Sequence, residues 1–267
     1  MNGTKILDQL WDQYLQSNLH VQDIHKLFLE QGENPINDHI ALRTIADHRV
    51  DINILAKAFI KDGYKVGGDY DFKIKKLKAI HLEPKNPDQP KVFISQLLTK
   101  NFSSKLQVKM QECIDAIPEI LLNDIDALLI SGSSWKNLSY AVYQDLLIES
   151  EYAAWFYVFG YRANHFTMFI NQLKKFNEVS EINEFLKSNG IKLNASGGEI
   201  KGTPDDHLEQ SSTLSGTIEV DFIEGKKTIP CCYFEFAKRY KDETGGLYQG
   251  FVAKSADKIF ESTNVKS

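Results

Sequence analysis

One order of secondary-structure elements is predicted twice in this chain: a strand, a helix and two further strands. The first copy is expected over residues 36–100, where "INDHIALRT" opens the strand and a helix follows at residues 51–61. The second copy is expected over residues 164–240, where "NHFTMFI" opens the strand and a helix follows at residues 180–188. Copies of one supersecondary unit pack side by side. The repeat therefore predicts a curved, mixed sheet built from two β-α-β-β units, with space for a further strand in each.

Two other parts of the chain have the apolar spacing of helices. Residues 1–30 carry apolar side chains at intervals of three and four in two short pieces, and residues 103–157 do so over a longer stretch. The first is expected to be an N-terminal helical segment and the second a helical insert between the two units. We therefore expect an α+β protein in which residues 1–267 form a single domain.

The composition excludes several classes of protein. The chain has 267 residues, a net charge of −5 and no block of Lys and Arg, so it lacks the basic surface that nucleic-acid backbones require. It has no apolar run long enough to cross a bilayer and no signal-peptide pattern at its start. We expect a cytoplasmic protein, a monomer or a weak homodimer, with neither a nucleic-acid nor a membrane partner.

Each predicted copy has a histidine at the start of its first strand, directly after Asp or Asn. His39 follows Asp38, and His165 follows Asn164. If the copies are related by a pseudo-two-fold axis, their first strands lie beside that axis, where the two imidazoles could meet. Either histidine alone would more often be an ordinary buried side chain.

Glu235 is the second anomaly, because it lies in "IPCCYFEFAK", which is apolar or aromatic on both faces of a strand. An isolated buried carboxylate costs several kcal/mol, so it must be paired, protonated or bound to a metal. An ion pair with Lys238, Arg239 or Arg43 is one explanation.

A metal site is the other explanation. Two neutral imidazoles, His39 and His165, with the Glu235 carboxylate would form the facial triad that binds Fe(II) in non-haem oxygenases. In the first copy Gln96 is expected near the place of Glu235, and an amide is a weak ligand. The pattern therefore favours three ligands over a closed four-ligand site.

Arg43 shares a strand face with His39 and lies four residues further on, about 13 Å away at a rise of ~3.3 Å per residue. Its guanidinium could bind a substrate carboxylate in a bidentate fork, or pair with a surface acid. His81 could face the same cavity, although a core position is the more frequent one for such a residue. The stretch "DDHLEQ" at residues 205–210 is expected to be a solvated connection.

The segments "NDHIALRT", "NHFT", "YFEFAKR" and "GFVAKSADKIFEST" resemble the 2-oxoadipate dioxygenase/decarboxylase family, long catalogued as a domain of unknown function. The resemblance covers roughly residues 36–263, and "DHIALRT" is its most specific part. It implies a fold similar to the vicinal oxygen chelate superfamily. The chain is expected to be a short form, because members with established activity are much longer.

The resemblance also implies an activity and a set of residues. The activity is that of a non-haem Fe(II) enzyme which consumes O2, releases CO2 from a 2-oxo acid such as 2-oxoadipate, and forms a 2-hydroxy acid. By motif, His39, His165 and Glu235 would be the metal ligands, and His39 and His165 would also contact the substrate. Arg43 would bind a substrate carboxylate, and Lys254 and Ser255 would contact the distal carboxylate.

Two other functions are compatible with the same residues. Imidazole and carboxylate ligands also suit Zn(II), Ni(II) and Mn(II), so the chain could be a metal-dependent isomerase or hydrolase of the vicinal oxygen chelate type. It could also be a binding protein that holds a small carboxylate without turnover.

Overall fold

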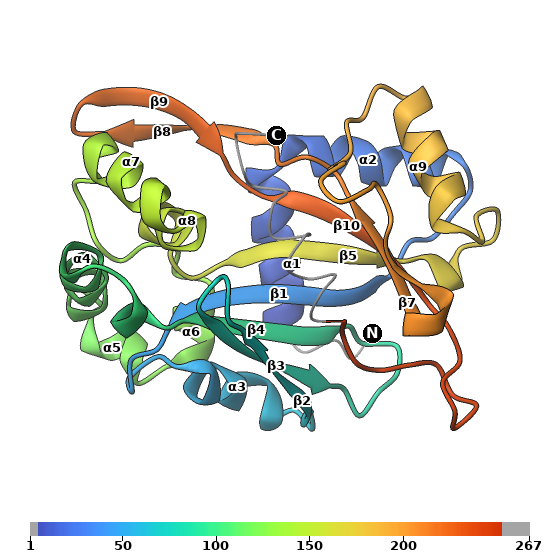
Figure 1. Cartoon of the computed structure of the whole chain (residues 1–267), viewed down its shortest axis with the longest axis horizontal. Helices are drawn as coiled ribbons and strands as arrows, with labels where there is room; N and C mark the ends of the chain where they lie inside the picture. Colours follow the sequence, from blue (N-terminus) through green and yellow to red (C-terminus); the bar gives the residue numbers. More distant parts are fainter. Residues whose placement is uncertain (1–4, 253–267) are drawn as a thin grey trace.

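The computed structural model describes residues 5–252. An eight-stranded sheet forms its centre, with the strand order β2-β3-β4-β1-β5-β10-β7-β6 (Figure 1). The first strands of the two copies are neighbours: β1 pairs antiparallel with β5, parallel with β4 on its other side, and β5 pairs parallel with β10. The predicted curved, mixed sheet of two like units is confirmed.

Each copy contributes a helix and at least four strands to this arrangement. The first copy consists of β1 (Asn37–Ile45), α3 (Ile52–Ile60), β2 (Lys65–Phe72), β3 (Leu77–Glu83) and β4 (Lys91–Leu97). The second consists of β5 (Ala163–Phe169), α9 (Val179–Ser188), β6 (Lys201–Thr203), β7 (Leu208–Ser212) and β10 (Tyr233–Arg239).

The second copy differs from the prediction between its helix and its last strand. The strand expected around residues 218–223 exists as β8 (Thr217–Phe222), but it pairs with β9 (Gly225–Pro230) in a separate hairpin. The sheet position beside β10 is taken by β7, which covers part of the stretch expected to be a solvated connection. That expectation was wrong, because a short strand inside a turn-rich segment has too few residues to show alternation.

The remaining helices lie before the first copy and between the two copies. Two precede the first copy, α1 (Lys5–Ser17) and α2 (Leu19–Glu30). Five lie between the copies: α4 (Ser104–Asp115), α5 (Glu119–Leu122), α6 (Ile125–Leu129), α7 (Tyr140–Glu149) and α8 (Glu151–Phe159). Short 3-10 turns occur at η1 (Thr99–Asn101), η2 (Ile170–Gln172) and η3 (Pro204–Asp206).

The two faces of the sheet have different surroundings. Helix α1 lies behind the central strands in Figure 1, and the rings of Trp11 and Tyr14 pack on Phe166 of β5 with centroids 4.8 and 5.0 Å away. Side chains alternate along a strand, so the neighbours of Phe166 in the chain, His165 and Thr167, face the opposite side. The apolar core beneath α1 thus fixes which side chains the sheet presents on its other face.

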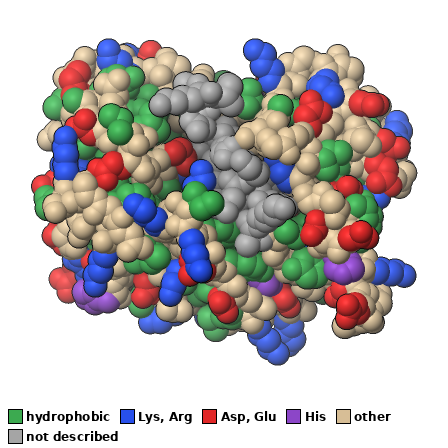
Figure 2. Space-filling model, viewed as in Figure 1, with side chains coloured by type: hydrophobic (Ala, Val, Ile, Leu, Met, Phe, Trp, Pro, Cys, Tyr) green, Lys and Arg blue, Asp and Glu red, His purple; other side chains and the backbone are tan. Residues whose placement is uncertain are grey.

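None of the helices in residues 5–252 is long and apolar enough to span a bilayer. On the face shown in Figure 2, acidic and basic side chains are interspersed.

Candidate metal centre

Three side chains from separate parts of the sequence meet on the sheet face opposite α1. His39, His165 and Glu235 each offer a ligand atom, and these atoms all lie within 4.8 Å of one another. His165 Nε2 is 3.1 Å from Glu235 Oε2, and His39 Nε2 is 3.9 Å from Glu235 Oε1. All three side chains are buried.

Strand register explains why these residues meet. Glu235 of β10 lies opposite Thr167 of β5, and Thr167 lies opposite His39 of β1. His165 is two residues before Thr167 and therefore on the same face. The three groups are thus set by backbone pairing across three adjacent strands, and rigid elements of this kind hold a site more accurately than loops do.

The residue before each histidine holds the imidazole ring. Asp38 Oδ1 accepts a hydrogen bond from His39 Nδ1 at 2.8 Å, and Asn164 Oδ1 lies 3.1 Å from His165 Nδ1. With Nδ1 engaged in this way, Nε2 of both rings faces Glu235, which is how an outer partner orients a metal-binding histidine. Nε2 of His39 also lies 3.0 Å from the hydroxyl oxygen of Thr167. Burial lowers the pKa of His165 and so favours the neutral ring that a metal requires. The repeated Asp/Asn-His pair thus has the same role in both copies.

The donor set fits a divalent cation. Two atoms bound at about 2.1 Å to one ion and at right angles to each other lie about 3 Å apart. The His165 Nε2 to Glu235 Oε2 distance of 3.1 Å matches this spacing. Two imidazoles and one carboxylate on one side of an ion leave the other positions open for substrate.

Asp38 has a second partner that sequence inspection missed. Arg239 donates from Nε to Asp38 Oδ2 at 2.6 Å and from Nη2 to Asp38 Oδ1 at 2.8 Å, and both side chains are fully buried. Burial acts to raise the pKa of Asp38, but the Arg239 guanidinium and the hydrogen bond from His39 hold that pKa well below its usual range. Arg239 Nη1 also donates to the carbonyls of Tyr248 and Gly250, at 2.9 and 2.8 Å.

Gln210 of β7 is the other residue that sequence inspection missed. Its side-chain amide donates to Glu235 Oε1, and the residue is buried. It lies in "DDHLEQ", which was expected to be a solvated connection. The five residues of this strand, "LEQSS", are too few to show the alternation of a strand, so the sequence carried no signal for Gln210.

Ion pairing does not explain the burial of Glu235. Each of the three cations considered for it has another partner: Arg239 pairs with Asp38, Arg43 with Glu151, and Lys238 with Glu178. Glu235 instead meets two imidazoles and a neutral amide, so that alternative was wrong.

The expected place of Gln96 was also wrong. His39 lies opposite Lys91 on β4, and His165 lies opposite Tyr233 on β10. Two residues further along each partner strand stand Phe93 in the first copy and Glu235 in the second. Gln96 instead accepts from the backbone N–H of Ile52 at 3.1 Å and so supports the start of α3.

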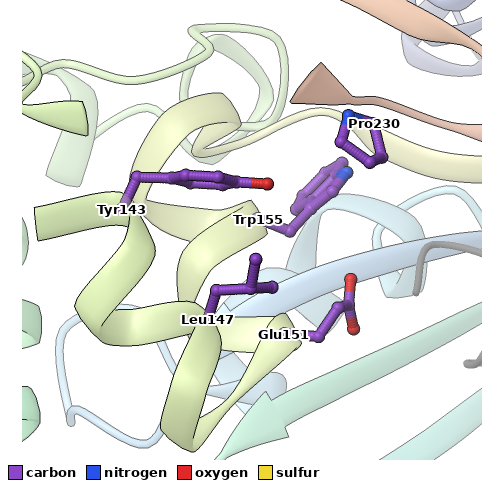
Figure 3. Close-up of a pocket in the computed structure, with 5 residues that line it drawn as sticks. All are labelled: Tyr143, Leu147, Glu151, Trp155 and Pro230. Carbon is purple, nitrogen blue, oxygen red and sulfur yellow. The ribbon is translucent and has the colours of Figure 1, made fainter. Parts of the chain in front are cut away.

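Arg43 is buried beside the metal ligands, between aromatic rings. Its guanidinium carbon lies 4.7 Å from the centre of the Tyr152 ring and 4.9 Å from that of Trp155. Nη1 donates to Glu151 Oε1 at 3.0 Å, whereas Nε and Nη2 have no hydrogen-bond partner among the described residues. Glu151 and Trp155 also line a small pocket with Tyr143, Leu147 and Pro230 (Figure 3).

Tyr233 completes the polar side of the site. Its ring stacks on that of His165, with centroids 4.6 Å apart and an interplanar angle of 28°. Its hydroxyl is buried and has no hydrogen-bond partner within residues 5–252. Burial raises the pKa of this phenol well above its usual range, so the hydroxyl remains a donor at neutral pH.

The aromatic side of the site comes from the first copy and from the chain after β10. Phe251 packs its ring on His39, His81 and Phe93, with centroids 4.8, 5.4 and 5.1 Å away. His81 is buried in β3, and its Nδ1 lies 2.8 Å from the hydroxyl oxygen of Tyr70. Lys254 and Ser255, expected near the distal carboxylate, lie outside the described residues.

The fold and the sequence both have known relatives. A sequence profile described as 2-oxoadipate dioxygenase/decarboxylase matches residues 6–245. The 2-oxoadipate dioxygenase/decarboxylase, chloroplastic, of Arabidopsis thaliana is 34% identical over 283 residues, which are 97% of this chain and 76% of that protein. A Ralstonia eutropha protein of the glyoxalase superfamily, 18% identical, shares the fold with a TM-score of 0.71 over 91% of this chain and 83% of its own. The expected likeness to the vicinal oxygen chelate fold is confirmed.

Two crystal structures are more similar still. The hydroxyglutarate synthase of Oryza sativa, solved in complex with 2-oxoadipate, is 32% identical with a TM-score of 0.90, over 97% of this chain and 91% of its own. A Shewanella frigidimarina protein, described provisionally as a hydrolase, is 46% identical with a TM-score of 0.87, over 93% of this chain and 96% of its own. The matches to the curated Arabidopsis and rice relatives cover 76% of each of those proteins, so both are longer than this chain, as the resemblance implied. Since the profile spans most of the chain and the Arabidopsis relative is 34% identical over three quarters of its own length, this chain belongs to the 2-oxoadipate dioxygenase/decarboxylase family.

Proposed function

We propose that this chain is an Fe(II)-dependent oxygenase that converts 2-oxoadipate or a similar 2-oxo dicarboxylic acid to a 2-hydroxy acid one carbon shorter. The observation that carries the proposal is the meeting of His39, His165 and Glu235 within 4.8 Å on rigid strands. The donor set is that of non-haem Fe(II) oxygenases. The crystal structure of the rice relative with 2-oxoadipate supports the choice of substrate.

Fe(II), when bound, would supply the oxygen chemistry that amino-acid side chains lack. The chain's own residues have three tasks. Asp38 and Asn164 orient the two imidazoles through Nδ1. The free Nε and Nη2 of Arg43 bind a substrate carboxylate, while Glu151 and two aromatic rings hold the guanidinium in place. The ring of Phe251 excludes water from the His39 side.

The direct test is reconstitution with single metals. Metal-free protein is loaded under argon with Fe(II), Mn(II), Ni(II) or Zn(II), and then mixed with 2-oxoadipate and air. We expect one O2 consumed and one CO2 released for each 2-hydroxyglutarate formed, with Fe(II) alone. Turnover without O2 uptake, with Zn(II) or Ni(II), would instead indicate an isomerase or hydrolase. If 2-oxoadipate bound equally well after metal removal and no turnover occurred, the chain would be a binding protein.

Arg43→Lys is expected to raise KM for 2-oxoadipate. A lysine retains the charge but cannot present two parallel N–H donors to a carboxylate. Losing one charge-assisted hydrogen bond raises KM for 2-oxoadipate by about tenfold or more. Arg49→Lys is the matched control, because Arg49 pairs with Asp47 away from the metal ligands. Equal KM values for the two variants would contradict the role of Arg43.

A further inference from the structure

Tyr233 carries a buried hydrogen-bond donor that the fold does not use. The residue is fully buried, and its hydroxyl has no partner among the residues that the structure describes. Leaving a buried polar group unpaired costs about 1–3 kcal/mol, so native proteins rarely do so without a functional reason. The carbonyl of Tyr233 accepts a hydrogen bond from the Tyr14 hydroxyl, and its ring stacks on that of His165.

The unused donor lies close to the unused donors of Arg43. His165 lies opposite Ala41 on one side and Tyr233 on the other, and Arg43 is two residues beyond Ala41 on the same face. Trp155 links the two groups, because its ring packs on the Arg43 guanidinium while its Nε1 donates at 2.7 Å to the carbonyl of Cys231. The side chain of Ala41, which lies beside His165 on this face, ends at Cβ.

We propose that the Tyr233 hydroxyl is a second anchor, beside Arg43, for a carboxylate of the bound 2-oxo acid. This inference rests on the proposed function and adds a residue to it. Arg43 offers Nε and Nη2, and Tyr233 offers one O–H. Three donors on one sheet face suit a carboxylate, which accepts through two oxygens and about four lone pairs.

The position of Tyr233 also separates this role from support of the metal. The ring, not the hydroxyl, contacts His165. Tyr233→Phe therefore removes the proposed substrate contact and retains the stacking. A substitution that disturbed the metal ligands would instead change metal affinity, by tenfold or more for a group that orients a ligand.

The test compares ligand binding by wild-type protein and Tyr233→Phe, both loaded with Fe(II) under argon. Calorimetry with 2-oxoadipate is expected to give a dissociation constant about tenfold or more higher for the variant. The dissociation constant for Fe(II) itself is expected to change by less than about tenfold. Tyr161→Phe, which removes another buried phenol hydroxyl, is the control and should bind both as wild type does.

A second ligand, the monocarboxylate 2-oxohexanoate, identifies which carboxylate is bound. Equal weakening for both acids places Tyr233 on the carboxylate beside the oxo group, and weakening for 2-oxoadipate alone places it on the far carboxylate. Both results support the inference. Wild-type affinity for both acids in Tyr233→Phe would overturn it and leave the proposed function intact. If wild-type protein bound neither acid, the proposed function and this inference would fail together.

Discussion

Glu235→Gln is expected to abolish turnover and to weaken divalent-metal binding by more than about 100-fold, which is the upper range for loss of a group that only supports a ligand. The amide has the shape of the carboxylate but not its charge, and it binds cations weakly. Metal titration of the purified variant gives the affinity, and O2 uptake with 2-oxoadipate gives the activity.

The free energy of unfolding, measured with and without metal, distinguishes loss of a metal ligand from loss of the fold. Without metal, Glu235→Gln should be at least as stable as wild type, because a buried carboxylate is removed. With metal at about 100 times the wild-type dissociation constant, wild type should gain about 2.7 kcal/mol and the variant less than about 0.4 kcal/mol. Lys238→Gln, on the same strand and paired with Glu178, is the control and should behave as wild type. A variant that gained as much from metal as wild type does would show that Glu235 is not a ligand.

Arg239→Met is expected to destabilise the metal-free protein by about 3–5 kcal/mol, the usual result of leaving one member of a buried ion pair alone. Asp38 would then stay buried without its guanidinium partner, and the carbonyls of Tyr248 and Gly250 would lose their donor. Urea unfolding measures the change in free energy.

A double-mutant cycle with Asp38→Asn assigns this loss to the pair. The double variant should be less destabilised than the sum of the single variants, because the lone buried charge is gone. The single variant Asp38→Asn should also weaken metal binding by about 10–100-fold through His39. Additive effects of the two substitutions would show that Asp38 and Arg239 do not act as a pair.

The sequence was sufficient to find the three candidate ligands because each breaks a pattern. A histidine or a glutamate within an apolar strand is visible without coordinates, and the repeat of two like units predicted that distant strands lie side by side. The same reasoning pointed to the Asp and Asn before the histidines, although their contact with Nδ1 required atomic positions.

The sequence did not reveal the register between paired strands or the partners of the buried polar side chains. Phe93, rather than Gln96, takes the place of Glu235 because the pairing of β4 with β1 fixes the offset, and nothing in the residues of β4 reveals that offset. Arg239 had several carboxylates within reach along the chain, and only the fold brings it to Asp38. Gln210 was hidden in a segment rich in turn-forming residues.

Phe93 of the first copy and Glu235 of the second occupy equivalent positions, and this difference affects how a ligand can lie in the site. A cavity between two identical halves would look the same to a molecule turned end for end. In this protein the second copy presents the carboxylate of Glu235 and the phenol of Tyr233, and the first copy presents the guanidinium of Arg43 and the rings of Phe93 and Tyr70. The divergence of the copies thus makes the site directional, and a molecule with unlike ends has one preferred way to lie in it.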